Sequence, residues 1–161
     1  MRFEEEYPSL ESFWRAVILF GRNSASYKFS MAKSLIELIP SGKSFITLEE
    51  LAVPFSNNLI LHLKLNDKQT TSQSSTMLNA CRQFIAGEIT HEQLIQQTVK
   101  YGFVNVLDAF HVVNQGDIPV KFFESDRKAK QKGIVITDDL FKLHETNQFT
   151  NFNLRLKPDG D

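Results

Sequence analysis

A long apolar stretch between Leu10 and Leu38 most constrains how this chain can fold. Its first part, Leu10 to Phe20, is apolar around most of a helical circumference and leaves only Glu11, Ser12 and Arg15 to face water. A helix of this kind is buried on most of its sides. We therefore predict a central helix over these residues.

A short turn follows this helix and leads into a second one. Gly21 suits the positive φ of a helix C-terminus, and Asn23 or Ser24 can accept a hydrogen bond from the amides that open the next helix. In the second helix, apolar residues recur at steps of three and four along one stripe: Ala25, Phe29, Ala32, Leu35 and Ile36. Because the turn is short, we expect the two helices to be antiparallel neighbours.

The length of 161 residues indicates one domain, and 42% apolar residues with fourteen phenylalanines are enough to build its core. We predict a single helical domain over residues 1–146 and a polar C-terminal tail over 147–161. Lys and Arg number 18 against 19 Asp and Glu, for a formal net charge of -1. No global field therefore draws the protein to nucleic acid or to an anionic membrane, and such binding requires a local patch.

The single cysteine, Cys81, excludes an internal disulfide framework and suits a reducing compartment. We interpret it as a small core residue. The N-terminus is acidic, unlike a secretory signal, and no apolar run approaches the roughly 20 residues that span a bilayer. These features predict a cytoplasmic protein with no membrane partner.

Helix signals continue through the middle of the chain. Thr47 and Glu50 have the spacing of a capping box, and Pro54 predicts a kink or a fresh start before a leucine-rich helix over Phe55–Leu65. Thr90 and Gln93 form a second candidate box. Three further helices are expected: Thr76–Ala86, Thr90–Tyr101 and Val104–Val113.

Near the C-terminus the pattern changes to short runs of aromatic and β-branched residues. Val120–Phe123 and Ile134–Thr137 predict a two-stranded hairpin, and Leu140–His144 predicts a last short helix. The fold class that follows is mainly α: a compact multi-helix domain built on an antiparallel helical hairpin, with one small β-hairpin near the C-terminus.

The spacing of the polar residues indicates no catalytic or metal site. The four histidines are widely separated along the chain: His62, His91, His111 and His144. Asp108 and His111 share a helix face at i and i+3, and we interpret them as a surface pair. No phosphate-binding glycine loop is present. We therefore expect no catalytic residue, metal ligand or cofactor on this chain, and an enzyme is the least favoured function class.

The connection of the predicted hairpin holds the one concentrated basic segment: Arg127, Lys128, Lys130 and Lys132. Four cations there can follow a phosphate backbone, as the wing of a winged helix does. The alternative is a solvated hairpin turn. A winged-helix arrangement also requires a polar and basic recognition helix, and the candidate over Phe55–Leu65 offers only Lys64, Asn57 and Asn58 among leucines.

The string FWRAVILFGRNSASYKFSMAKSL at Phe13–Leu35 resembles the opening of a family of bacterial HNH endonuclease proteins that carry a long helical region before the nuclease motif. The resemblance continues through Ile46–Ala52, Asp108–His111 with Ile118–Pro119, and Gly133–Leu140. It implies a context of restriction or phage defence, with target binding, dimerisation or partner docking as the role of this region. The family's nuclease motif lies further C-terminal. No histidine follows His144, so no HNH residue can be assigned here.

Two functional hypotheses follow. The first is a non-catalytic module that contacts or targets duplex DNA, weakly and in a salt-dependent way, through the four cations of the hairpin connection helped by Arg22 and Lys28. The second is a protein-interaction module, with itself or a nuclease or defence protein as partner, that docks through a leucine face formed by Leu59, Leu61 and Leu63.

Overall fold

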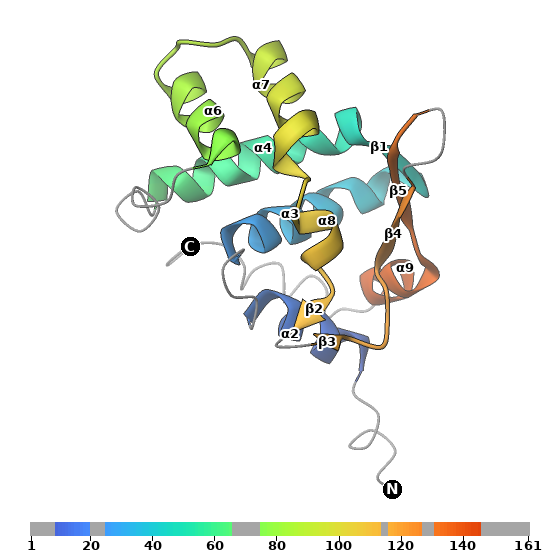
Figure 1. Ribbon diagram of the computed structural model, residues 1–161. Coiled ribbons are helices and arrows are strands. Elements are labelled where there is room, and N and C mark those ends of the chain that lie inside the picture. Colours follow the sequence, from blue (N-terminus) through green and yellow to red (C-terminus); the bar gives the residue numbers. More distant parts are fainter. Residues whose placement is uncertain (1–8, 20–24, 66–74, 114–115, 127–130, 146–161) are drawn as a thin grey trace, which may run out of the picture.

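The computed structural model describes residues 9–19, 25–65, 75–113, 116–126 and 131–145 (Figure 1). These residues form a mainly α fold with a small sheet, which confirms the predicted fold class. The α-helices are α2 (Leu10–Leu19), α3 (Ala25–Leu38), α4 (Leu48–Leu65), α6 (Thr76–Ile85), α7 (His91–Gln97), α8 (Val106–Ala109) and α9 (Asp138–His144). A 3-10 turn over Ile39–Ser41 follows α3, and a π-helical turn over Thr98–Gly102 follows α7.

The central helix is α3 and not α2, so the prediction for the first helix was wrong. Helix α3 contacts α2, α4 and α8, and it is buried on most of its sides (Figure 1). Small residues such as Ser30, Ala32 and Ser34 let these neighbours approach closely. Helix α2 buries Trp14 and Val17, and its Leu19 is 66% exposed. Both helices have apolar periodicity, and only the packing shows which of them lies inside.

Helices α2 and α3 lie side by side and run in opposite directions, as expected (Figure 1). The predicted turn between them, at Gly21 and Asn23, lies outside the described residues. Helix α2 also contacts α9 and the strand pair that follows α8. The helical hairpin therefore joins the helical part of the domain to its C-terminal part.

The prediction at Pro54 was a kink or a fresh start, and the fresh start was wrong, because α4 runs as one helix through Pro54. Proline removes one amide donor, the one that would bond the Glu50 carbonyl. The packing of the helix compensates, because Leu51, Phe55 and Leu59 are fully buried on its inner side.

Both predicted capping boxes are present. The Glu50 amide donates to Thr47 Oγ1 at 3.1 Å, and the Thr47 amide donates to Glu50 Oε1 at 3.0 Å, at the start of α4. The Gln93 amide and Thr90 Oγ1, together with the Thr90 amide and Gln93 Oε1, make the same reciprocal pair at the start of α7. These contacts satisfy amides that have no partner within the helix.

The predicted hairpin forms, but its first strand begins three residues later than expected. Strand β4 is Phe123–Asp126 and β5 is Gly133–Ile136. They pair in antiparallel register from Phe123 opposite Ile136 to Asp126 opposite Gly133. Val120–Phe122 precede the strand; the Phe122 carbonyl still accepts a bond from the Thr137 amide, but its own amide donates to the ring of His111.

A third strand, β1 (Phe45–Thr47), pairs with β5 and gives the sheet order β1-β5-β4. This pairing brings the start of α4 against the hairpin, and the Leu48 amide donates to the Lys132 carbonyl at 3.0 Å. A separate short antiparallel pair joins β2 (Val112–Val113) to β3 (Gly116–Asp117). The hairpin is therefore held from the side by the chain that precedes α4.

An aromatic cluster joins the sheet to the helices. The Trp14 ring lies 5.1 Å from that of Phe122 and 6.0 Å from that of Phe110, measured between centroids. Phe110 and Phe123 are 5.2 Å apart in the same way. All four residues are buried. Within the part of the chain that the structure describes, no helix has the length and apolar character needed to cross a membrane.

Candidate functional site

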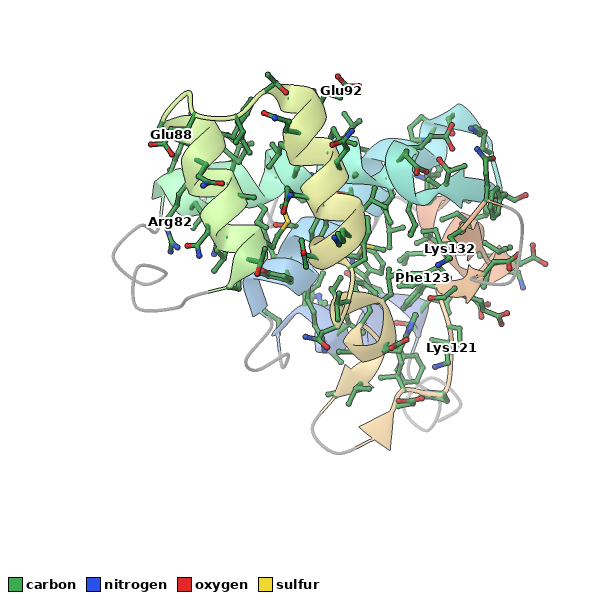
Figure 2. The ribbon with its side chains drawn as sticks, turned by 45° about the horizontal axis from the view of Figure 1, so that its top comes forward. Arg82, Glu88, Glu92, Lys121, Phe123 and Lys132 are labelled. Atoms are coloured by element: carbon green, nitrogen blue, oxygen red, sulfur yellow. The ribbon has the colours of Figure 1, made fainter. Side chains whose placement is uncertain are left out.

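The outer end of the β4–β5 hairpin is the place where the chain concentrates its cations. The last paired residues are Asp126 and Gly133, so residues 127–132 connect the two strands. Arg127, Lys128 and Lys130 of this connection lie outside the described residues. Lys132 is described and exposed, on the sheet side of the molecule (Figure 2). The connection is thus anchored by a strand pair and by the start of α4.

An open hollow of about 680 Å³ lies next to this connection. Its lining includes Lys43, Phe45 and Gln131. Lys43 Nζ is bound to the Glu50 carboxylate, and this contact is the main reason why the pKa of Glu50 lies below its usual range. Lys43 is thus paired with Glu50 at the surface, and the basic character of this end depends mainly on the hairpin connection.

Lys28 does not belong to a DNA-contacting surface, so this part of the prediction was wrong. Its side chain is buried, and Nζ donates a hydrogen bond to the Val112 carbonyl at 2.7 Å. Burial lowers the pKa of the ammonium group. An ammonium that lies inside the protein on a backbone carbonyl is not available to a phosphate. Arg22 lies outside the described residues.

The predicted leucine interaction face does not exist. Leu59 is fully buried and Leu63 is 3% exposed, whereas Leu61 is 52% exposed. Positions 59 and 63 are one helical turn apart and share a face, while position 61 projects from nearly the opposite side. Leu59 and Leu63 form part of the core. Of the three predicted interface residues, only Leu61 is exposed.

The outer face of α4 does not have the chemistry of a DNA recognition helix. Its exposed residues are chemically mixed: Glu49, Glu50, Val53, Asn57, Leu61, Lys64 and Leu65. Asn58 is buried, and its Nδ2 donates to Ser34 Oγ and to Glu37 Oε1, each at 3.3 Å. A helix in the major groove needs polar and basic side chains along its outer face. The exposed residues therefore agree with the sequence of this helix, which offers few polar and basic side chains for the major groove.

His111 and Asp108 are not the surface pair that their spacing suggested. Asp108 is exposed, but His111 is 4% exposed, and its Nε2 accepts a hydrogen bond from the Phe122 amide at 2.9 Å. The neutral ring therefore carries its proton on Nδ1. Burial lowers the pKa of His111 to about 4, and the nearby Lys121 charge adds to this effect. No sequence signal marks this histidine as buried, because its backbone partner is eleven residues away.

The buried His111 predicts a loss of stability in acid. Above pH 6.5 the ring is neutral in both states; between pH 6.5 and about 4 the unfolded chain binds a proton that the folded chain does not. Unfolding is therefore increasingly favoured as the pH falls through this window, by a total of about 3 kcal/mol. Urea denaturation at several pH values measures this dependence.

The matched variant is His111→Gln, whose side-chain oxygen can still accept the Phe122 amide. Other groups titrate in the same window, so the informative quantity is the free energy of unfolding of the wild type minus that of the variant. We expect this difference to decrease from pH 7 to pH 4. A difference that stays constant with pH would show that His111 does not titrate as a buried group.

Other chemistry-bearing groups form no site in the described part of the chain. No group of three or more His, Cys, Asp or Glu side chains there is arranged to hold a metal ion. Cys81 is fully buried, which confirms it as a core residue, and burial raises the pKa of its thiol to about 12. Such a thiol is not a nucleophile at neutral pH. No family model, curated protein or solved structure matches this chain.

Proposed function

We propose that this chain contacts duplex DNA through the connection between β4 and β5, as a non-catalytic module of a restriction or defence protein of the HNH-nuclease type. The observation that supports the DNA contact is the placement of four cations, at positions 127, 128, 130 and 132, within one hairpin connection. Lys and Arg side chains in such a segment neutralise phosphates without reading sequence. The nuclease context rests on the resemblance of Phe13–Leu35, and a cytoplasmic location goes with the single cysteine.

The surroundings of the connection favour contact with a polyanion. The ends of the hairpin are fixed by the pair between Asp126 and Gly133 and by the bond from the Leu48 amide to the Lys132 carbonyl. The exposed acids Glu88 and Glu92 lie at the α6–α7 end of the molecule, well away from Lys132 (Figure 2). The fixed base favours binding of phosphate at the hairpin, whereas Glu124 and Asp126 of β4 are the carboxylates on the hairpin itself that oppose it.

The test is fluorescence-polarisation binding of the full chain to labelled duplex DNA at low and moderate salt. We expect weak binding whose affinity falls steeply with salt, with a slope of about -0.9 for each phosphate neutralised. A variant with Arg127, Lys128, Lys130 and Lys132 all changed to Glu is expected to lose most of this affinity. The same samples are measured by light scattering to detect self-association.

The matched control changes four other exposed lysines to Glu: Lys64, Lys100, Lys121 and Lys142. It alters the net charge by the same amount but leaves the hairpin connection intact, so we expect it to retain more affinity than the hairpin variant. Equal losses of DNA affinity in the two variants would show that only the net charge matters. That result would contradict the assignment of the hairpin connection as the DNA-contacting site. No binding of the wild type at low salt would contradict the DNA proposal altogether and favour the protein-interaction hypothesis.

A further inference from the structure

The exposed residues of helix α4 form a single stripe along its length. The helix has 18 residues, and its exposed positions are Glu49, Glu50, Val53, Asn57, Leu61, Lys64 and Leu65. With about 3.6 residues per turn, all of them lie within about 80° of the direction of Asn57 around the helix axis. The opposite side of the helix carries the buried Leu51, Phe55 and Leu59. The α4 stripe, as we call these exposed residues, is therefore centred on Asn57.

The α4 stripe holds apolar side chains that the fold leaves uncovered. Val53 is 41% exposed, Leu61 is 52% exposed and Leu65 is 57% exposed. They are three of the eight large apolar side chains that are exposed in the described part of the chain. Exposed apolar side chains that gather on one helix face are typical of a surface where another helix docks. A helix packed on this stripe would remove Val53 and Leu61 from water.

Asn57 lies at the centre of the stripe, one helical turn from Val53 on one side and from Leu61 on the other. Its side chain has both a donor, the NH₂ group, and an acceptor, the oxygen. Two copies of this residue can therefore bond each other reciprocally across a two-fold axis. In coiled coils, a single Asn within an apolar helix seam fixes the register of the pair in this way.

The charged residues near the two ends of the stripe indicate which partner it fits. In an antiparallel pairing centred on Asn57, Glu49 and Lys64 of the second copy lie on the same side of the pair and within one residue of the same level. Val53 lies at the level of Leu61 of the second copy. A parallel pairing would instead place like charges at the same level. Glu49 and Lys64 make no salt bridge within the described part of the chain, so both charges are available to a second copy.

We propose that the α4 stripe pairs with the same stripe of a second copy of this chain, in antiparallel orientation around Asn57. Because one helix face from each copy takes part, the interface falls in the small class of transient contacts, below about 1,200 Å². We therefore expect a reversible dimer that dissociates at micromolar concentrations. The pairing goes beyond the proposed DNA contact and uses no residue of the hairpin connection, so either proposal can fail without the other.

Sedimentation velocity of the full chain, from low to high micromolar concentration, tests the pairing. For the wild type we expect the average mass to rise from monomer toward dimer. Leu61→Lys is expected to weaken association at least about tenfold, because it brings an unpaired charge against Val53 of the second copy. The matched control is Val104→Lys, the same kind of change at an apolar residue that is 56% exposed and lies outside α4. We expect this control to associate as the wild type does.

A double variant tests the orientation. Adding Val53→Glu to Leu61→Lys places opposite charges at the same level on the two copies, twice in each dimer, only if the helices are antiparallel. We expect this addition to restore association. Circular dichroism of each variant shows that it is folded, as we expect for substitutions at exposed positions.

Three results would overturn the proposal. A wild type that remains monomeric at high micromolar concentration would show that the stripe does not bind a second copy and leave it to a partner of different sequence. A dimer that forms equally well with Leu61→Lys would place the contact on another surface. A double variant that associates no better than Leu61→Lys alone would exclude the antiparallel pairing around Asn57.

Discussion

Leu59→Ala is expected to lower the free energy of unfolding by about 2–5 kcal/mol, while Leu61→Ala changes it by no more than about 0.5 kcal/mol. Leu59 is fully buried and belongs to the hydrophobic core, so the truncation leaves a cavity that the packing around it fills only in part. Leu61 is 52% exposed on the same helix, and its removal uncovers little. Comparing the two variants isolates the effect of burial on stability, because the residue type, the helix and the substitution are the same in both.

Urea denaturation measures both variants, with the fluorescence of Trp14 as the probe. Trp14 is the only tryptophan of the chain, and it is fully buried in the aromatic cluster, so its emission reports unfolding. Equal slopes of unfolding free energy against urea show that the same surface is exposed in each case. If Leu61→Ala lowered the free energy of unfolding as much as Leu59→Ala does, this result would contradict the orientation of α4 in the structure.

Gly133→Ala is expected to destabilise the protein by about 3 kcal/mol, the upper end of what overpacking usually causes. A Cβ at position 133 would overlap the Ile46 carbonyl oxygen and lie 2.8 Å from Cζ of Phe45. The oxygen belongs to the backbone of β1, so it cannot move away without disturbing the pairing of β1 with β5. The same shift would loosen the bond between the Leu48 amide and the Lys132 carbonyl that anchors the hairpin.

The control is Gly116→Ala, where an added Cβ meets no atom within 4 Å and the backbone is not in the left-handed region. We expect this change to alter stability by no more than about 0.5 kcal/mol. Thermal and urea unfolding compare the two variants with the wild type. Similar stabilities of Gly133→Ala and Gly116→Ala would show that β1 does not approach β5 as closely as the structure indicates.

The local signals of the chain were read reliably from its sequence. Both capping boxes were predicted because each depends on residues three positions apart, such as Thr90 and Gln93. The hairpin was predicted from its aromatic and β-branched runs, although its first strand begins at Phe123 instead of Val120. These features follow from contacts between near neighbours in the chain, which periodicity and spacing describe directly.

The candidate functional residues were predicted less well, for a physical reason. Lys28 and Leu59 were assigned to surfaces from residue type, yet both are buried. A lysine is read as exposed unless a partner is known, and the partner of Lys28 is a carbonyl 84 residues away. His111 was misread in the same way, since its ring accepts an amide from another segment. Spacing along the chain carries no information about such partners.

The amino-acid sequence by itself determined most of the helices, the caps that begin α4 and α7, the hairpin and the position of the basic residues in its connection, but the helix expected over Val104–Val113 is only Val106–Ala109, and Val112–Val113 is a strand. Each depends on the intrinsic preferences of residues within a few positions of one another. The tertiary structure decided that α3 and not α2 is central, that β1 joins the hairpin to make a sheet, and which leucines of α4 are covered. These depend on which segments meet in space, because burial is a property of the neighbours of a residue and not of the residue alone.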